Sequence, residues 1–177
     1  MSYVLTAYLV DLADLKSMMG SKDRSIIQDV ESIISEVYKD DEEEIDPQNA
    51  AVRALVMGER LHPENSDAYA SALWHICKVK GEELPPDAWG GVRWDSIEVC
   101  GLEDLLTKTG PPVKLPPHQD IPYVGHIKHS DVDPYLQTAE EKAADTDDDG
   151  VRGLLEEYIA WLEEAKSREK DIVFFYG

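Results

Sequence analysis

The segment DTDDDGVRGLLE, from Asp145 to Glu156, has the residue types and spacing of a calcium-binding EF-hand loop. Such a loop places oxygen ligands at its first, third and fifth positions, a glycine at its sixth and a two-oxygen glutamate at its twelfth. Those positions hold Asp145, Asp147, Asp149, Gly150 and Glu156. One hypothesis for this segment is therefore a calcium site.

Other features of the segment favour an ordinary acidic turn. The eighth position, where an apolar residue is expected, is Arg152, and the ninth is Gly153, which has no side-chain ligand. The chain also has no second loop of this kind with which the first could pair. Aspartates that precede a helix can instead cap its first N–H groups and interact favourably with its dipole. Both interpretations stay open at this point.

A second group of possible ligands surrounds the sequence GHIKH. His126 and His129 are three positions apart, His118 precedes them, and Asp131 and Asp133 follow. Histidines and carboxylates at such spacings can hold zinc. Nearby prolines make the segment irregular, so the spacing cannot be converted into geometry. A surface loop with ordinary histidines is the competing interpretation.

The sequence WGGVRW supplies two indole rings, Trp89 and Trp94, and the guanidinium of Arg93. Such groups can recognise a partner, or line a pocket together with the connection Pro111–His129. The competing interpretation is that the tryptophans are packing anchors. The sequence contains no nucleophile elbow, phosphate-binding glycine loop or dinucleotide fingerprint, so it predicts no catalytic residue.

The charge of the chain is strongly acidic, with 37 acidic and 17 basic residues and a net charge of −20. This charge disfavours nucleic acids and anionic membranes, and it attracts a basic protein or divalent cations. Solubility alone is the competing explanation. The densest acidic run is the candidate partner-binding surface, and it consists of Asp40, Asp41, Glu42, Glu43 and Glu44.

The pattern of apolar residues predicts the helices and strands that position these candidate residues. The 177 residues, 42% of them apolar, are enough for one domain over residues 1–177. The β-branched and aromatic runs at 3–10 and 171–177 predict two buried strands that pair with each other. Helices are predicted at 11–19, 23–37, 46–58, 66–80, 102–106, 130–144 and 154–166. The fold class is therefore α+β, with several helices around a small sheet that includes both end strands.

Three further expectations concern the connections and the location of the protein. Residues 40–44 and 85–91 are predicted to be loops, and the proline-rich segment 111–123 an extended connection. Cys77 and His75 are expected in the core of their helix, as a small hydrophobe and a core histidine. The N-terminal apolar run lacks preceding basic residues, and no run is long enough to span a membrane, so a cytoplasmic protein is expected.

Several landmarks along the chain suggest a family. They are MSYVLTAYLVDLADL, AVRALVMGE, YASALWHIC with KGEEL, TGPPVKLPPHQDIPYVGHI and YIAWLEEAKSREKDIVFFYG. In these landmarks the chain resembles a bacterial family of uncharacterised proteins, of actinobacterial type, that is a domain of unknown function. It is also distantly similar to YfbM-like small α+β proteins. The resemblance implies a soluble bacterial single-domain protein, and it implies no activity, cofactor or catalytic residue.

The leading hypothesis is a non-enzymatic interaction protein, immunity-like or regulatory, whose acidic surface covers a basic partner. One alternative is a small-molecule binder or enzyme with a pocket near Trp89–Trp94 and Pro111–His129. The other is a weak calcium-binding module that uses the loop Asp145–Glu156. No cofactor other than calcium is expected, and the oligomeric state is left open.

Overall fold

The structure is a computed structural model that describes residues 3–39, 41–117 and 121–177. Its centre is an antiparallel sheet in the order β2-β1-β5-β4, with β3 also paired to β1. The strands are β1 (Tyr3–Val10), β2 (Glu82–Leu84), β3 (Gly90–Val92), β4 (Tyr123–Ile127) and β5 (Asp171–Tyr176). β1 and β5 pair from Leu5↔Tyr176 to Val10↔Asp171, which confirms the predicted pairing of the two end strands.

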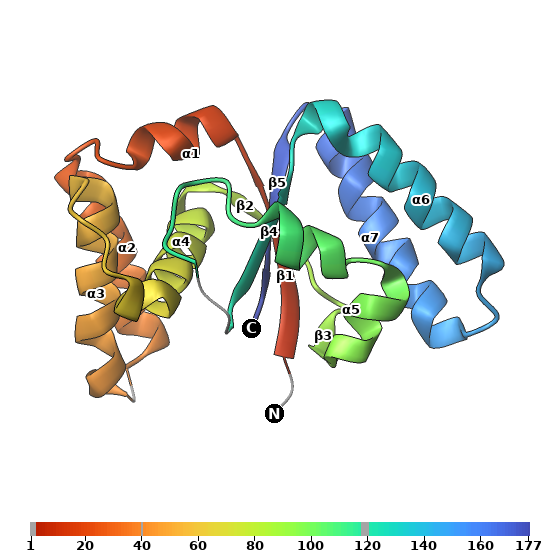
Figure 1. The fold of residues 1–177 in the computed structure, drawn as a ribbon, viewed down its shortest axis with the longest axis horizontal. Coiled ribbons are helices and arrows are strands. Elements are labelled where there is room, and N and C mark those ends of the chain that lie inside the picture. The colour runs from red at the N-terminus through yellow and green to blue at the C-terminus, as the bar shows by residue number, and fades with distance from the viewer. Residues whose placement is uncertain (1–2, 40, 118–120) are drawn as a thin grey trace.

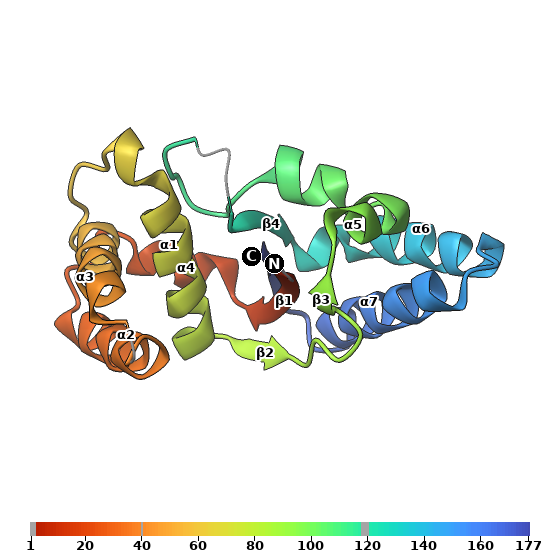
Figure 2. The same ribbon diagram turned by 90° about the horizontal axis from the view of Figure 1, so that it is seen from below.

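Helices cover both faces of this sheet. They are α1 (Leu12–Met18), α2 (Arg24–Val37), α3 (Glu42–Met57), α4 (Ser66–Lys80), α5 (Trp94–Cys100), α6 (Val132–Asp145) and α7 (Asp149–Ser167). Figure 1 shows α1 to α4 on one side of the sheet and α5 to α7 on the other. The view from below in Figure 2 shows the same separation. The α+β prediction is confirmed, and its arrangement is three layers with the sheet in the middle.

The apolar run of β1 follows from this layered arrangement. Tyr8 and Val10 point into the core beneath α1 to α4, whereas Leu5, Ala7 and Leu9 point into the core beneath α5 to α7. A strand that is covered on both faces has no solvent side, so its sequence is continuously apolar instead of alternating. The two cores share one sheet, and the described residues form one compact domain.

The first helices begin where the sequence predicts. The Asp11 carboxylate accepts hydrogen bonds from the N–H groups of Ala13 and Asp14 at 2.9 and 3.1 Å and caps α1. The Asp23 carboxylate accepts one from the N–H of Ser25 at 2.9 Å and caps α2. The buried residues of α2 recur at helical spacing and are Ile26, Ile27, Val30 and Ile34. Val37, at the end of the helix, is 48% exposed.

The start of α3 corrects one prediction. The acidic run was expected to be a loop before a helix that begins near Asp46, but α3 begins at Glu42. Carboxylates in a first turn interact favourably with the partial positive charge of the helix N-terminus, which offsets their mutual repulsion. Pro47 therefore lies inside α3 and not in its first turn. Asp40 lies outside the described residues.

The middle of the chain differs more from prediction. Tyr123–Ile127 forms β4, although it was expected to be an irregular connection. α5 was not predicted, and a short π-type turn, Leu105–Thr109, stands where the helix 102–106 was expected. Gly125 explains the packing of the turn on β4, because a Cβ atom there would lie 2.5 Å from the carbonyl oxygen of Leu105.

The buried position of His75 makes the stability of the protein depend on pH. His75 is 8% exposed, and its ring packs edge-on against Tyr38 with the ring centroids 5.9 Å apart. Burial, with a smaller effect from Lys78, lowers its pKa to about 4. The unfolded chain has an ordinary histidine pKa of about 6.5, so the unfolded state takes up the proton first as the pH falls. Stability is therefore complete above about pH 6.5 and decreases toward pH 4.

We expect the free energy of unfolding to fall by about 2 kcal/mol between pH 7 and pH 5 through His75 alone. Urea unfolding at both pH values measures this change. The His75→Leu variant has no proton to take up at this position, so its stability should depend less on pH over the same interval. Equal pH dependence in the two proteins would contradict the assignment.

Candidate functional site

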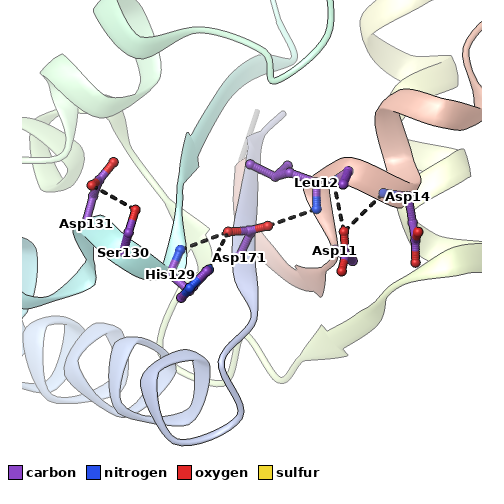
Figure 3. A network of polar contacts seen from close by, with 8 residues as sticks. Asp11, Leu12, Asp14, His129, Ser130, Asp131 and Asp171 are labelled. Carbon is purple, nitrogen blue, oxygen red and sulfur yellow. Dashed lines mark hydrogen bonds and ion pairs between the residues drawn. The ribbon is translucent and has the colours of Figure 1, made fainter.

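One end of the sheet brings together chain segments that are far apart in the sequence. β1 and β4 end there and β5 begins there, at the top of the sheet in Figure 1. The Asp171 carboxylate, 14% exposed, accepts hydrogen bonds from the N–H of Leu12 at 2.9 Å and the N–H of His129 at 2.8 Å. Figure 3 shows this carboxylate between the two backbone segments. One side chain therefore ties the ends of three strands together.

The histidines of the predicted zinc group do not converge. The ring Nδ1 of His129 lies 3.5 Å from the Asp171 carboxylate, while Nδ1 of His126, within β4, lies 2.9 Å from the carbonyl oxygen of Gly110. The Asp131 carboxylate accepts a hydrogen bond from Ser130. His118 lies outside the described residues. Among the described residues, no group of three or more His, Cys, Asp or Glu side chains could hold a metal ion.

A hollow of about 330 Å³ lies at this end of the sheet and is bordered by three segments. α1 and its cap carry two carboxylates, Asp11 and Asp14. The cations are Lys80, the last residue of α4, and Arg168 and Lys170 in the turn before β5. The apolar lining consists of Leu9, Val10, Leu15, Met18 and Cys77. A second hollow, of about 310 Å³, shares Asp11 and is bordered by Lys16, Lys128, His129 and Glu169 among others.

The basic side of the first hollow is fixed by ion pairs. The Arg168 guanidinium donates to both oxygens of Glu82 at 2.8 and 2.7 Å, and to Glu164 at 3.3 Å. These bonds, above all those to Glu82, raise the pKa of Arg168, and they lower the pKa of Glu82. The Lys80 ammonium lies 2.7 Å from the Asp29 carboxylate. The end of α4 and the turn before β5, which carry the cations, are therefore held to their surroundings.

The acidic side is ordered by the start of α1. The N–H groups of Asp14 and Ala13 hold the pKa of Asp11 below its ordinary value, because they donate hydrogen bonds to its carboxylate. Figure 3 shows Asp11 and Asp14 at the start of α1, close to Asp171. The end of the sheet thus presents carboxylates from α1 and its cap, and cations from the end of α4 and the turn before β5.

The predicted calcium segment joins two helices. Asp145 is the last residue of α6, and the Asp148 carboxylate accepts hydrogen bonds from the N–H groups of Gly150 and Val151 at 2.8 and 3.0 Å. α7 therefore begins at Asp149, five residues before its predicted start at Leu154, and it includes Glu156. The structure gives this segment a helix-capping role. Within the described part of the chain, the carboxylates of Asp145, Asp147, Asp149 and Glu156 are not gathered into a group that could hold a metal ion. Calcium binding through them stays a prediction, and it requires the segment to rearrange around the ion.

The two roles of this segment differ in a measurable way. Replacing Asp148 with alanine should lower the free energy of unfolding by about 1 kcal/mol, because two N–H groups of α7 lose their acceptor. Replacing Glu156 with glutamine should leave stability unchanged, with or without millimolar calcium. Thermal unfolding of both variants measures the effects. A calcium-dependent rise in Tm that Glu156→Gln abolishes would show instead that the loop binds the ion.

The tryptophans act mainly as packing anchors, as one of the two interpretations predicted. Trp89 is fully buried, and its Nε1 donates to the carbonyl oxygen of Leu154 at 3.1 Å. Trp161 donates to the carbonyl oxygen of Pro85 at 3.2 Å, so the two indoles fasten the segment 85–89 to α7. Arg93 is exposed and lies 3.8 Å from Asp95.

The predicted pocket of the proline-rich connection has a counterpart in the structure. A hollow of about 440 Å³ is lined by this connection and its neighbours, Leu106, Thr107, Gly110, Pro111, Leu115, Pro116, Pro117, Tyr123 and Val124. The ring of Trp94 packs against Tyr123 with the ring centroids 5.0 Å apart. The two predicted segments, Trp89–Trp94 and Pro111–His129, therefore contact each other at Tyr123, which lines the hollow.

The sequence patterns did not indicate the residues around the hollow at the end of the sheet. Asp14, Arg168 and Lys170 belong to no motif, and the hollow combines positions from Leu9 to Lys170. One weak signal was available: the sequence KSREK, residues 166–170, concentrates basic residues in a strongly acidic chain.

The fold and these sites define a three-layer α+β domain with an acidic surface and a mixed-charge hollow at one end of its sheet. Among the described residues, no helix has the length and apolar character that crossing a membrane requires. The chain belongs to the family described as Domain of unknown function (DUF7691), which matches residues 1–177. Membership in a domain of unknown function confirms that part of the resemblance. Comparisons with curated proteins and with solved structures found no match.

Proposed function

We propose that this protein is a non-enzymatic interaction module that contacts a basic protein through the acidic start of α3. The observation that carries the proposal is the exposure of Asp41, Glu43, Glu44 and Asp46 in a chain of net charge −20. Among the described residues, Val37 and Val99 are the large apolar side chains left exposed, at 48% and 56%. Charge therefore offers a stronger basis for recognition on this surface than apolar burial does.

The acidic start of α3 suits electrostatic recognition. Its carboxylates extend from the first turns of a helix that packs against α2 and α4, so the backbone beneath them is fixed. Opposite charges on a partner increase the rate of association, and salt screens this attraction over about 8 Å at physiological ionic strength. In a bacterium, the source that the resemblance implies, such a module would be immunity-like or regulatory. Its cytoplasmic location stays a prediction.

The test uses a charge-neutralised α3 and a matched control. The α3 variant combines Asp41→Asn, Glu43→Gln, Glu44→Gln and Asp46→Asn. Asp41 makes no side-chain capping bond, so its amide removes charge without removing a cap. The control carries the same number of neutralised acids on exposed positions of α6 and the turn after it, namely Glu140→Gln, Glu141→Gln, Asp145→Asn and Asp147→Asn.

Each protein is used to capture partners from the native host at low salt, and affinity for the captured partner is then measured at increasing salt. We expect the α3 variant to bind at least about tenfold more weakly than wild type and the control to stay close to wild type. Equal losses in both variants would mean that only total charge matters. That result, or the absence of any captured protein, would refute the proposal.

A second candidate function is small-molecule binding in the hollow of the proline-rich connection. The packing of Trp94 against Tyr123 favours it, because aromatic side chains are common in ligand pockets. Leu115 lines this hollow, so Leu115→Trp should fill it and abolish the binding of any ligand found by NMR screening. A ligand that binds this variant as tightly as wild type binds elsewhere and contradicts the candidate.

A further inference from the structure

We propose that the hollow of about 330 Å³ at the end of the sheet binds a small zwitterion with an apolar side chain, of the free α-amino acid class. The site is distinct from the acidic start of α3, and the inference does not depend on a protein partner. It rests on the separation of charges around the hollow, on the groups that are left unpaired there, and on the apolar lining.

The charges around the hollow are balanced in number, although the chain as a whole is strongly acidic. Three cations, Lys80, Arg168 and Lys170, face three carboxylates, Asp11, Asp14 and Glu82. Two of the carboxylates, Asp11 and Asp14, come from α1 and its cap, while the cations come from the end of α4 and from the turn before β5. The third carboxylate, Glu82, lies in β2 on the cationic side and is engaged by Arg168. A ligand with one charge meets attraction and repulsion together. A zwitterion that carries an ammonium and a carboxylate group on the same carbon can place each group near residues of opposite charge.

Salt bridges within the protein engage some of these charges. The pKa of Asp11 is lowered chiefly by the backbone hydrogen bonds from Asp14 and Ala13 at the start of α1, and Lys170 also helps to lower it from a longer distance. Glu82 is engaged by Arg168, and Lys80 by Asp29. Asp11 accepts the capping hydrogen bonds of α1. In the part of the chain that the structure describes, the side chains of Asp14 and Lys170 have no ion-pair partner. We infer that Asp14 receives the ligand's ammonium and that Lys170 receives its carboxylate.

The lining of the hollow suits an apolar side chain of modest size. Leu9, Leu15, Met18 and Cys77 border it, and of these four Met18 is half-buried and offers accessible apolar surface, whereas the others lie buried beneath it. Gly81 also lines the hollow. A Cβ atom at this position would lie 2.7 Å from the carbonyl oxygen of Cys77, so a larger residue would not fit there. Pockets for small molecules range from about 300 to 1,000 Å³, so this hollow suits a metabolite the size of leucine or methionine.

Calorimetry with matched ligands tests the charge requirement. L-leucine and L-methionine are compared with 4-methylpentanoate, which lacks the ammonium group, with 3-methylbutylamine, which lacks the carboxylate, and with glycine, which lacks the apolar group. We expect the two amino acids to bind and the three analogues to bind at least about tenfold more weakly. A carboxylate-only ligand that binds as tightly as leucine would show a plain anion site. No binding of either amino acid at millimolar concentration would also overturn the inference.

Two single substitutions test the assigned residues. Asp14→Asn and Lys170→Gln should each weaken leucine binding about tenfold or more. Glu98→Gln and Lys114→Gln make the same charge changes on exposed positions that do not line the hollow and are remote in sequence from the acidic start of α3, and they should bind leucine like wild type. Unchanged affinity in both site variants would refute the assignment. Partner capture through α3 should be the same in all four variants, which separates this inference from the proposed function.

Discussion

Replacing Trp89 with alanine should lower the free energy of unfolding by about 4 kcal/mol. The indole is fully buried and packs beside Trp161 with the ring centroids 6.4 Å apart. The substitution removes this apolar contact, leaves a cavity between the segment 85–89 and α7, and deletes the hydrogen bond to the carbonyl oxygen of Leu154. Urea unfolding followed by circular dichroism measures the loss.

Two further variants separate the contributions of Trp89. Trp89→Phe keeps much of the apolar volume but loses the N–H donor, so we expect a smaller loss of about 2 kcal/mol. Val99→Ala, at a side chain that is 56% exposed, should change stability by less than about 0.5 kcal/mol. A loss below about 1 kcal/mol for Trp89→Ala would mean that the indole does not anchor this segment.

Replacing Asp171 with alanine should lower the free energy of unfolding by about 3 kcal/mol. Its two carboxylate oxygens accept hydrogen bonds from the backbone of Leu12 and of His129, and the Leu12 residue is 4% exposed. Both N–H groups lose their acceptor in the variant, and unsatisfied donors at a packed junction are costly. Chemical denaturation measures the change, and hydrogen exchange at the Leu12 amide should become faster.

Asparagine is the informative control at this position. Asp171→Asn retains one acceptor oxygen and replaces the other with an amide group that cannot accept, so we expect it to recover about half of the lost stability. Asp131→Ala removes a nearby exposed carboxylate that accepts a hydrogen bond from the adjacent Ser130 side chain, and its effect on stability should be close to zero. If Asp171→Ala and Asp131→Ala behave alike, the carboxylate is not what joins the strands.

The parts of the fold that the sequence predicts are those set by continuous local patterns. β1, apart from Thr6, and β5, after Asp171, are apolar along their length because helices cover both faces of the sheet. α2 repeats its apolar residues at helical spacing between Ile26 and Ile34, and a capping aspartate precedes it. The acidic surface also follows from composition, because charged side chains seldom lie in a core.

The remaining parts depend on contacts that no local pattern contains. α5 is short, exposes Val99, and follows a glycine-rich stretch that reads as a loop. β4 becomes a strand because β5 offers it a free edge, which is a property of the sheet and not of its own sequence. The hollow at the sheet end relies on Glu82 and Arg168, which pair across 86 residues. Spacing along the chain cannot reveal such a pair.

The central place of β5 has a consequence for how the protein is made. β5 lies between β1 and β4, and Thr6 of β1 is matched with Phe175 across 169 residues. On the ribosome, β1 emerges first, and one of its edges stays unpaired until the β5 segment has been translated. Assembly of the sheet is therefore a late event with high contact order, and the nascent chain must keep an apolar strand from aggregating in the meantime. Molecular chaperones that hold extended apolar segments are the natural protection during that interval.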